Sequence, residues 1–491
     1  MSKFIYSQLY IDGQWAEAQG GATYPVLNPA TEEEIGRAAD ASSADMERAI
    51  AAARRAFDTG PWPRMAPRER APFIRRIADG LEKHKDRLRE LLVAEAGAEF
   101  FLLAGQLDNP IAALNEYAEA ARNFDFEQML PVKTVQSVAG PMLGYTLLNH
   151  QAAGVCGLIP TWNFPLYVTA QKIGPALATG CTMILKAPPY TPLVNLELAK
   201  VIEESDLPAG VFNAVSGQSI GISEQLVASR HVDKISFTGS VGVGKRIAQT
   251  AAATLKRVHL ELGGKSASIV LDDVDPVMVT PGLTAPTYVH SGQICGAATR
   301  CFLPRKLYDA TLASMADFVN ALAVGDPADP TVIVGPVIRA ERRQKIEEYI
   351  NSGREQGARL IAGGERPSNL KKGYFIKPTI FANVDNQMRI AREEIFGPVL
   401  SVIPYDDLDD AVRKANDSDF GLAGIVVTNQ PARGLEIARR LRSGWISLSA
   451  SGHMAGLGVN APFGGFKDSG LGREGGKWGL LDYSEIQTIT W

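Results

Sequence analysis

One cysteine of this sequence stands between two glycines and is a candidate nucleophile. Cys295 follows Gly292 and precedes Gly296 in the segment HSGQICGAATR, which ends at residue 300. A thiolate is a strong nucleophile, and its formation depends on neighbours that lower the pKa of the thiol. The residues from Ala297 to Arg300 are predicted to begin a helix, whose N-terminal amides would stabilise a thiolate. The alternative is a buried cysteine that only packs, which is the commoner role of this residue type.

Two polar side chains stand at the ends of predicted strands, where ligands of parallel sheets bind. Residues 155–160 and 182–186 have the apolar character of buried strands; Asn163 lies just after the first and Lys186 ends the second. The Asn163 amide could polarise a carbonyl oxygen, or it could only cap the helix that follows. Lys186 could contact a phosphate or a ribose, or it could be an ordinary exposed lysine.

A further candidate for the functional site is the segment FTGSVGVGK at residues 237–245, in which a strand runs through a glycine turn into a helix. The start of a helix is a natural seat for a phosphate, because its free amides and its dipole favour an anion. Gly239, Gly242 and Gly244 form the pattern G-x-x-G-x-G, so the usual dinucleotide fingerprint is not met. The alternative is a flexible connection between strand and helix.

Glu261 opens the segment ELGGK and allows three interpretations. It lies about 20 residues past the glycine turn, where a Rossmann unit places the acid that binds the cofactor ribose. It could instead be a general base on a loop beside Cys295. The commonest outcome for such a residue is an ordinary salt bridge at the end of a strand. Of the two functional interpretations, spacing alone favours the ribose acid.

The elements that must position these residues alternate between strand and helix. Helices are predicted at 164–179 and 193–205, between strands at 155–160, 182–186, 211–215 and 234–238. This alternation predicts a parallel, doubly wound sheet. After about Gly263 a second α/β series follows, with strands near 267–271, 381, 399–403 and 424–428 and helices at 311–322, 339–357 and 408–416.

The remaining segments flank these two series. Residues 9–15 predict a hairpin around an Asp-Gly turn. Amphipathic helices are predicted at 43–57, 66–95 and 110–126. Residues 132–150 and 486–491 are rich in β-branched and aromatic residues, and the first of these is predicted to form a hairpin arm.

Composition excludes several classes of function. A chain of 491 residues is too long for a single hydrophobic core. The net charge of -4 gives no basic surface for binding nucleic acid. No apolar run approaches the length that spans a membrane, and the N-terminus does not resemble a signal peptide. Four cysteines without a CxxC pair suit a reducing cytoplasm. Six scattered histidines lack zinc-ligand spacing, so we expect no metal.

Taken together, the motifs resemble those of the NAD(P)-dependent aldehyde dehydrogenase superfamily, over essentially the whole chain. Five blocks occur in the family's order: PTWNFP at 160–165, FTGS at 237–240, ELGGK at 261–265, GQIC at 292–295 and EIFGP at 394–398. The segment PFGGFK at 462–467 is similar to the family's closing motif. A match to any one block is weak evidence for the family, but matches to all of them in the family's order are hard to obtain by chance.

The resemblance implies a role for each candidate. Cys295 matches the nucleophile, Glu261 the general base, and Asn163 the amide that stabilises an oxyanion together with the backbone N–H of Cys295. The cofactor site is expected to include Ile159, Thr161, Trp162, Lys186, Gly239, Ser240, Gly244, Leu262, Glu394 and Phe396.

The resemblance also implies an architecture and a reaction. We expect two doubly wound α/β domains, a Rossmann-like cofactor domain (1–131 and 151–260) and a catalytic domain (261–477), with a small β oligomerisation arm (132–150 and 478–491) that builds a homodimer or homotetramer. The expected reaction oxidises a small-molecule aldehyde to the acid with NAD, or with NADP. An apolar or aromatic aldehyde is favoured by Trp162, Tyr167, Leu457 and Phe463.

Three rival functions remain to be separated. A CoA-acylating semialdehyde dehydrogenase generally lacks a base like Glu261. A non-catalytic, crystallin-like protein on the same fold would not need Cys295, Asn163 and Glu261 together. A cysteine hydrolase would not need the residues expected to contact a nicotinamide.

Two segments depart from the family pattern. Family members often have K-P-S-E where this chain has Lys186-Ala187-Pro188-Pro189, so the glutamate expected to bind the adenosine ribose is absent. Residues 447–453 lack the asparagine that is common after the tryptophan, which leaves substrate specificity open there.

The first departure predicts the cofactor preference. A carboxylate about 4 Å from a 2′-phosphate repels it by roughly 4 kcal/mol at an effective dielectric constant near 20, and Pro189 provides no such repulsion. We therefore expect NAD to be used and NADP to be tolerated, and Pro189→Glu to shift the ratio of kcat/KM values toward NAD. An unchanged ratio would place the discrimination elsewhere, for instance at Ser219 or Gly221.

Overall fold

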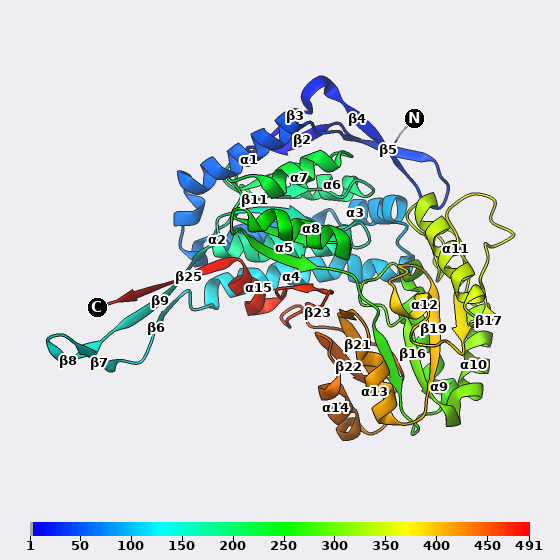
Figure 1. Cartoon of the computed structure of the whole chain (residues 1–491). Helices are drawn as coiled ribbons and strands as arrows, with labels where there is room; N and C mark the ends of the chain where they lie inside the picture. Colours follow the sequence, from blue (N-terminus) through cyan, green and yellow to red (C-terminus); the bar gives the residue numbers. More distant parts are fainter. Residues whose placement is uncertain (1–2) are drawn as a thin grey trace.

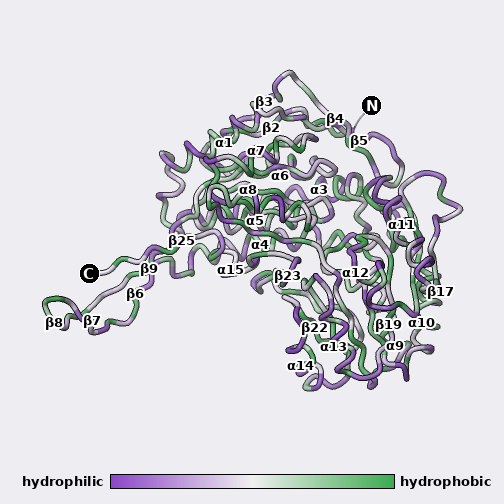
Figure 2. The backbone as a smooth tube through the Cα atoms, viewed as in Figure 1, coloured by the Kyte–Doolittle hydropathy of each residue, from purple (hydrophilic) through white to green (hydrophobic). Residues whose placement is uncertain are grey.

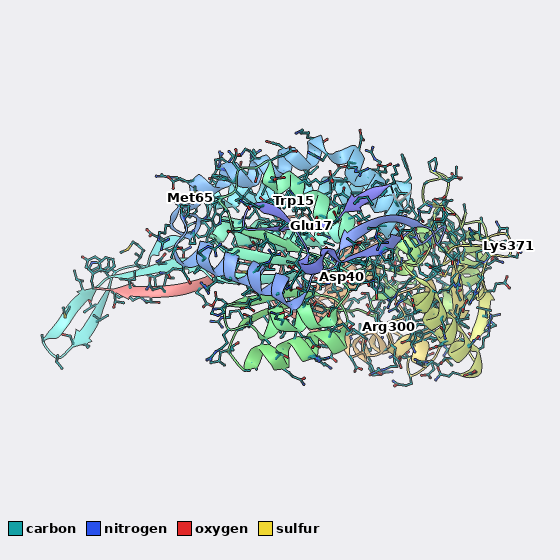
Figure 3. The ribbon with its side chains drawn as sticks, turned by 90° about the horizontal axis from the view of Figure 1, so that it is seen from above. Trp15, Glu17, Asp40, Met65, Arg300 and Lys371 are labelled. Atoms are coloured by element: carbon teal, nitrogen blue, oxygen red, sulfur yellow. The ribbon has the colours of Figure 1, made fainter. Side chains whose placement is uncertain are left out.

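Two large sheets form the body of the protein, and a β arm projects from one side of it (Figure 1). The structure is a computed structural model that describes residues 3–491. The arm also projects in the view turned by 90° (Figure 3), so it is separate from the body in space. In Figure 2, hydrophobic stretches lie mainly inside the body, and hydrophilic ones on outer helices and loops. None of the helices within the described residues has both the length and the apolar character needed to cross a bilayer.

The first sheet has five parallel strands at its centre, and its chain order reverses between β10 and β13. Ligands of open α/β sheets bind beyond the carboxyl ends of the strands at such a reversal. The hairpin of β2 and β3, predicted from the Asp-Gly turn, extends one edge. The order is β24 (Gly470–Leu471), β14 (Arg257–Glu261), β13 (Lys234–Thr238), β10 (Val155–Ile159), β11 (Thr182–Lys186), β12 (Phe212–Val215), β2 (Gln8–Ile11), β3 (Gln14–Glu17).

Helices cover both faces of this sheet, which explains why its central strands are almost wholly apolar. One face packs against α2 (Pro67–Lys83), α4 (Leu103–Asn123), α5 (Pro165–Thr179) and α6 (Pro192–Glu203). The other face packs against α1 (Ser43–Asp58), α7 (Ile220–Ala228) and α8 (Val241–Ala252).

The second sheet is parallel except for one edge strand, β17. Its order is β17 (Arg359–Ala362), β18 (Thr379–Ala382), β19 (Val399–Tyr405), β16 (Arg300–Pro304), β15 (Ala267–Val270), β21 (Ala423–Val427), β22 (Trp445–Ser449). One face packs against α11 (Ala340–Glu355), α13 (Leu408–Asn416) and α14 (Pro431–Arg440), the other against α9 (Pro276–Tyr288) and α10 (Tyr308–Asn320). The predicted α/β class with two doubly wound sheets is confirmed, whereas the predicted domain boundaries remain predictions.

The arm is built from segments far apart in sequence. Its three-stranded sheet consists of β6 (Glu127–Met129), β9 (Thr146–Ala152) and β25 (Ser484–Thr490), with β25 at one edge. Its tip is the hairpin of β7 (Lys133–Ser137) and β8 (Gly140–Gly144). The rings of Tyr145 and Trp491 stack with centroids 5.6 Å apart, which fastens the C-terminus to the arm.

Some predicted helices have different bounds. The helix expected over 66–95 ends at Lys83, because His84 leaves helical geometry, and α3 (Lys85–Leu91) follows as a separate helix. The helix expected to begin at Pro110 begins at Leu103, with Pro110 inside it. A small sheet of β1 (Phe4–Tyr6), β4 (Thr23–Leu27) and β5 (Glu34–Ala39) was not predicted, because short strands like these give little periodicity.

Candidate active site

The candidate catalytic residues lie where the two sheets meet. Glu261 is the last residue of β14, at the carboxyl edge of the first sheet, and the chain then crosses to the amino end of β15 in the second sheet within residues 262–266. Asn163 follows β10, and Cys295 lies in the loop that leads into β16. Three segments that are distant in sequence therefore converge between the sheets.

A cavity of about 650 Å³ occupies this junction. Ten of the thirteen residues predicted for the site line it: Thr161, Trp162, Asn163, Gly239, Ser240, Glu261, Leu262, Cys295, Glu394 and Phe396. Ile159, Lys186 and Gly244 are not in the lining. The volume lies in the range of pockets that hold a cofactor or a small substrate.

The loop before Cys295 is conformationally strained. His290 and Ser291 have φ of 54° and 52°, and Gly292 follows with φ of 72°. Left-handed geometry at residues other than glycine is costly and is found preferentially at functional sites. The Ser291 hydroxyl donates to the carbonyl of Gly335, which holds the loop in this form. The strain supports a functional assignment for the loop.

The environment of Cys295 raises the pKa of its thiol instead of lowering it. Burial raises the pKa to about 12, the charges of Glu261 and Glu394 act in the same direction, and the amides of Gly296 and Cys295 oppose them. The helix expected to begin at Ala297 is absent, because the chain extends directly into β16, paired with β15 and β19. The prediction of a helix that stabilises a thiolate was therefore wrong, and the surroundings favour the protonated thiol.

Asn163 is tied to the cysteine loop. Its Nδ2 donates to the carbonyl oxygen of Gln293 at 2.6 Å, and its Oδ1 is buried without a hydrogen-bond partner. The residue at the N-cap of α5 is Phe164, so capping by Asn163 is excluded. The second amide N–H of Asn163 remains free to donate to an oxyanion near Cys295.

Glu261 is buried, and neither of its oxygens has a hydrogen-bond partner. Burial raises the pKa of this carboxyl well above its usual value, and the charge of Glu474 raises it further, while Lys172 and Arg473 oppose the shift. A carboxyl with a raised pKa suits proton transfer near neutral pH. Glu261 therefore has the properties of a general base.

The cavity also fits a dinucleotide. The side chain of Ser240 forms no cap at the start of α8, which leaves the helix amides free for a phosphate. The buried hydroxyl of Thr238 has no partner. Phe396 has φ of 52° and meets the Trp162 ring edge-on at 5.5 Å, which forms an aromatic wall for a flat ring.

The three predicted residues outside the lining have other surroundings. Lys186 is buried and donates to the carbonyls of Ala187 and Gly217 at 3.0 and 2.7 Å, and burial lowers the pKa of its ammonium to about 8. It is therefore not an ordinary exposed lysine. Gly244 allows α8 to approach Leu262, because a Cβ there would collide with that side chain. Ile159 packs against the core at the end of β10.

Sequence reasoning missed several lining residues. Asn109 and Leu102 come from α4 and the turn before it, and they carry no local motif. The apolar wall also includes Val168, Val289, Met454, Leu457 and Phe463, of which only the last two were predicted. Glu474, also in the lining, forms a 2.6 Å ion pair with Lys172. The sequence offered no signal for these contacts, because they depend on how the two sheets meet.

The cavity and its residues can be compared with known proteins. The sequence pattern described as the aldehyde dehydrogenase family matches residues 15–489. The chain belongs to the aldehyde dehydrogenase family. This confirms the expected family and the assignment as an aldehyde dehydrogenase enzyme.

Individual members of the family are similar over almost their whole lengths. The 3-succinoylsemialdehyde-pyridine dehydrogenase of a Pseudomonas species is 40% identical over 488 residues, which cover 99% of this chain and 98% of the relative. The Mycobacterium tuberculosis aldehyde dehydrogenase complexed with NAD+ is 40% identical, with a TM-score of 0.93 over 99% of this chain and 98% of that one. A mutant of aldehyde dehydrogenase C (AldC) from Pseudomonas syringae, complexed with NAD+ and octanal, is 36% identical, with a TM-score of 0.91 over 98% and 96%.

The site predicts which thiol reacts. Cys295→Ala should abolish dehydrogenase activity while cofactor binding stays measurable by calorimetry, because the nucleophile is lost and the dinucleotide surface is not. Cys156, Cys181 and Cys301 are buried outside the lining, so an alanine at each should keep most activity. Activity in Cys295→Ala together with its loss in Cys301→Ala would identify Cys301 as the nucleophile.

Proposed function

We propose that this enzyme oxidises an aldehyde to the carboxylic acid with NAD, through a thioester on Cys295 that is hydrolysed with Glu261 as general base. The observation that supports the proposal is the convergence of Cys295, Asn163 and Glu261 on one cavity whose lining also fits a dinucleotide. The family member complexed with NAD+ at 40% identity supports the choice of cofactor.

The first step needs a base, because burial raises the pKa of the Cys295 thiol and so favours its protonated form. Glu261 takes this proton, and the sulfur attacks the aldehyde carbon. The carbonyl oxygen becomes an oxyanion, which accepts hydrogen bonds from the free N–H of Asn163 and the backbone N–H of Cys295. Loss of one such donor typically costs about 3–4 kcal/mol of transition-state stabilisation.

The cofactor completes the oxidation. A nicotinamide dinucleotide, when bound, supplies the acceptor for the hydride that leaves the tetrahedral carbon. Ser240 and the start of α8 would hold its phosphates, Glu394 a ribose, and Phe396 with Trp162 the ring. Glu394 already accepts a hydrogen bond from the N–H of Gly264 at 3.0 Å, which fixes its direction.

Glu261 acts again in hydrolysis of the thioester. Once its carboxyl is deprotonated, it removes a proton from water, the water oxygen attacks the acyl carbon, and the C–S bond breaks. A CoA-acylating enzyme needs no such base, so Glu261 in the lining favours water as the acceptor. The same assay also separates the other rivals, since a cysteine hydrolase and a crystallin-like protein would not reduce NAD.

The wall of the cavity favours an apolar aldehyde. Val168, Val289, Met454, Leu457 and Phe463 present hydrophobic surface to the cavity. Burial of each CH₂ group of a substrate contributes about 0.8 kcal/mol. We propose medium-length aliphatic or aromatic aldehydes as the substrate class, in line with the octanal complex of the relative from Pseudomonas syringae.

The test of the overall function is a panel of aldehydes assayed with NAD and with NADP, without CoA. Reduced-cofactor absorbance should appear, with kcat/KM rising as the alkyl chain of the aldehyde lengthens. A reaction that requires CoA, or no reduction with any aldehyde, would overturn the proposal.

Replacement of the base tests both proposed steps that use Glu261. Glu261→Gln keeps the shape of the side chain but cannot accept the proton, so thioester hydrolysis should slow by about 10²–10⁴-fold. If acylation remains competent, a burst of reduced cofactor should precede slow turnover. The turnover of the wild-type enzyme should rise with pH through the pKa of Glu261, because the base works deprotonated, and the variant should lose this rise. If the variant turned over as fast as the wild-type enzyme, Glu261 would be removed from the mechanism.

The arm is proposed to pair with another copy of the chain. β25 is an edge strand, and the side chains of Ile486, Ile489 and Trp491 are 57%, 40% and 62% exposed. Exposed apolar edge strands invite pairing with another chain. Such pairing would build the homodimer or homotetramer expected for this family.

The double variant Ile486→Lys and Ile489→Lys should shift the protein to smaller species in sedimentation velocity, because charges on the arm oppose burial. Val277→Lys on α9 is a matched control, since Val277 is 67% exposed and lies outside the arm. A wild-type protein that sediments as a stable, active monomer would contradict the proposed assembly.

A further inference from the structure

Glu261 has a buried neighbour that the proposed reaction does not use. Nε2 of His259, two residues earlier on β14, lies 3.8 Å from the Glu261 carboxylate and 3.4 Å from that of Glu474. The other ring nitrogen, Nδ1, lies 3.0 Å from the carboxylate of Asp482. The imidazole is fully buried. One titratable ring therefore lies among three carboxylates in a low-dielectric interior.

Two ammonium groups face the same carboxylates. Lys172 of α5 lies 2.6 Å from Glu474 and 3.0 Å from the hydroxyl of Ser236. Lys234 of β13 lies 2.9 Å from Asp482. Both lysines are almost completely buried. They bind the two carboxylates that flank His259 and leave Glu261 unpaired.

Other polar groups complete the surroundings of the ring. Arg473 is half-buried and donates to the carbonyls of Gly465 and Gly472. The buried phenols of Tyr117 and Tyr483 lie near Glu474 and Asp482, and burial keeps the pKa of both phenols high, so they stay neutral.

Two of the three carboxylates around the ring are paired with a cation. Lys172 binds Glu474 and Lys234 binds Asp482, whereas neither oxygen of Glu261 has a hydrogen-bond partner. A buried charge without compensation is expensive. The basic group beside the Glu261 carboxylate that could hold a proton for it is the ring of His259, 3.8 Å away.

We infer that His259, beside Asp482, takes the proton from Glu261 between the steps of the reaction, and so acts through the base as a positioning residue. The inference depends on the proposed role of Glu261 as the base. The O–H bond of the Glu261 carboxyl breaks and an N–H bond forms at Nε2, after a small rotation of the Glu261 side chain. The product is an imidazolium between Asp482 and Glu474.

The ring returns this proton by the same route once the acid product has left the cavity. Nε2 gives the proton back to Glu261, which releases it to water in the cavity. Nδ1 keeps its own proton beside Asp482 throughout, so the starting tautomer is restored. Although burial opposes it, contact with His259 and Lys234 lowers the pKa of Asp482 to about 2, so this group stays ionised and stabilises the imidazolium.

The local packing leaves both partners ready for transfer. Neither oxygen of Glu261 and neither ring nitrogen of His259 has a well-aligned hydrogen bond. Gly472, with φ of 90°, lies against the ring, and a Cβ there would collide with Nδ1. The imidazole is thus held in place by packing, without a strong bond that would trap the proton.

The test uses His259→Gln in the full-length enzyme, measured with NAD and a saturating aldehyde beside wild type and Glu261→Gln. Glutamine fills most of the volume of the ring but cannot carry a proton. We expect the burst of reduced cofactor to remain, and the later turnover to fall roughly 10²-fold, at the low end of proton-transfer effects. The pH dependence of the later turnover should also change, because Glu261 then exchanges its proton only with the cavity.

Variants at Asp482 provide a second, independent measurement. Asp482→Asn keeps the imidazole but removes the charge that stabilises the imidazolium, so it should show the same split between burst and turnover. Asp482→Glu restores the carboxylate and should recover most of the turnover. His150→Gln is the matched control, since His150 is a buried histidine of the arm, and it should behave as wild type.

Each outcome separates the two proposals. Wild-type turnover and pH dependence in both His259→Gln and Asp482→Asn would overturn the inference, even where Glu261→Gln shows its burst. An equal loss of burst and turnover would show a structural role for His259 and would also overturn it. Wild-type turnover in Glu261→Gln would instead overturn the proposed base. If His259→Gln does not fold, Asp482→Asn and Asp482→Glu decide by the same criteria.

Discussion

Burial of two acids in one cavity is the constraint on which the proposed chemistry depends. The thiol of Cys295 and the carboxyl of Glu261 are each harder to ionise than in water, because an isolated charge is poorly solvated between the sheets. In the proposed reaction, the thiol of Cys295 therefore becomes a thiolate by passing its proton to a neighbour within the cavity. A protonated thiol is also a weak nucleophile and oxidises slowly.

The connection between the two sheets makes this burial possible. Only residues 262–266 separate β14 from β15, so the end of one sheet and the start of the other are held close together. Gly263 and Gly264 lie in this crossing, and a Cβ on them would collide with the Glu394 carboxylate and with the carbonyl of Cys295. The missing side chains let both functional segments approach the crossing. Larger residues there would separate Glu261, Cys295 and Glu394, the proposed base, nucleophile and ribose ligand.

The elements of the fold that depend on local sequence patterns could be predicted from the sequence. The alternation of apolar strands and helices identified both parallel sheets, and the Asp-Gly turn identified the β2–β3 hairpin. Motif residues beside strand ends led to Asn163 and Glu261, because the carboxyl edge of a parallel sheet gathers such residues. The helix expected after Cys295 failed for the converse reason, since pairing of β16 with β15 and β19 outweighs local preference.

Properties that depend on the meeting of distant segments could not be predicted. The raised pKa of Cys295 comes from burial and from the charges of Glu261 and Glu394, which lie 34 residues before it and 99 after it in the chain. The apolar wall joins Leu102 to Phe463, and no sequence spacing encodes such a pair. A motif identifies a nucleophile, but its protonation state is a property of the assembled cavity.

The C-terminal segment links the site to the arm. Glu474 lies in the cavity lining, Asp482 ends α15 (Gly476–Asp482) beside His259, and β25 begins two residues later at Ser484. Arg257 at the start of β14 forms a bidentate ion pair with Glu485 of β25, with hydrogen bonds of 2.6 and 2.9 Å. The strand that carries Glu261 is therefore fastened at its far end to the arm. The proposed pairing of the arm with a second chain would therefore act on the strand that carries Glu261, the proposed base.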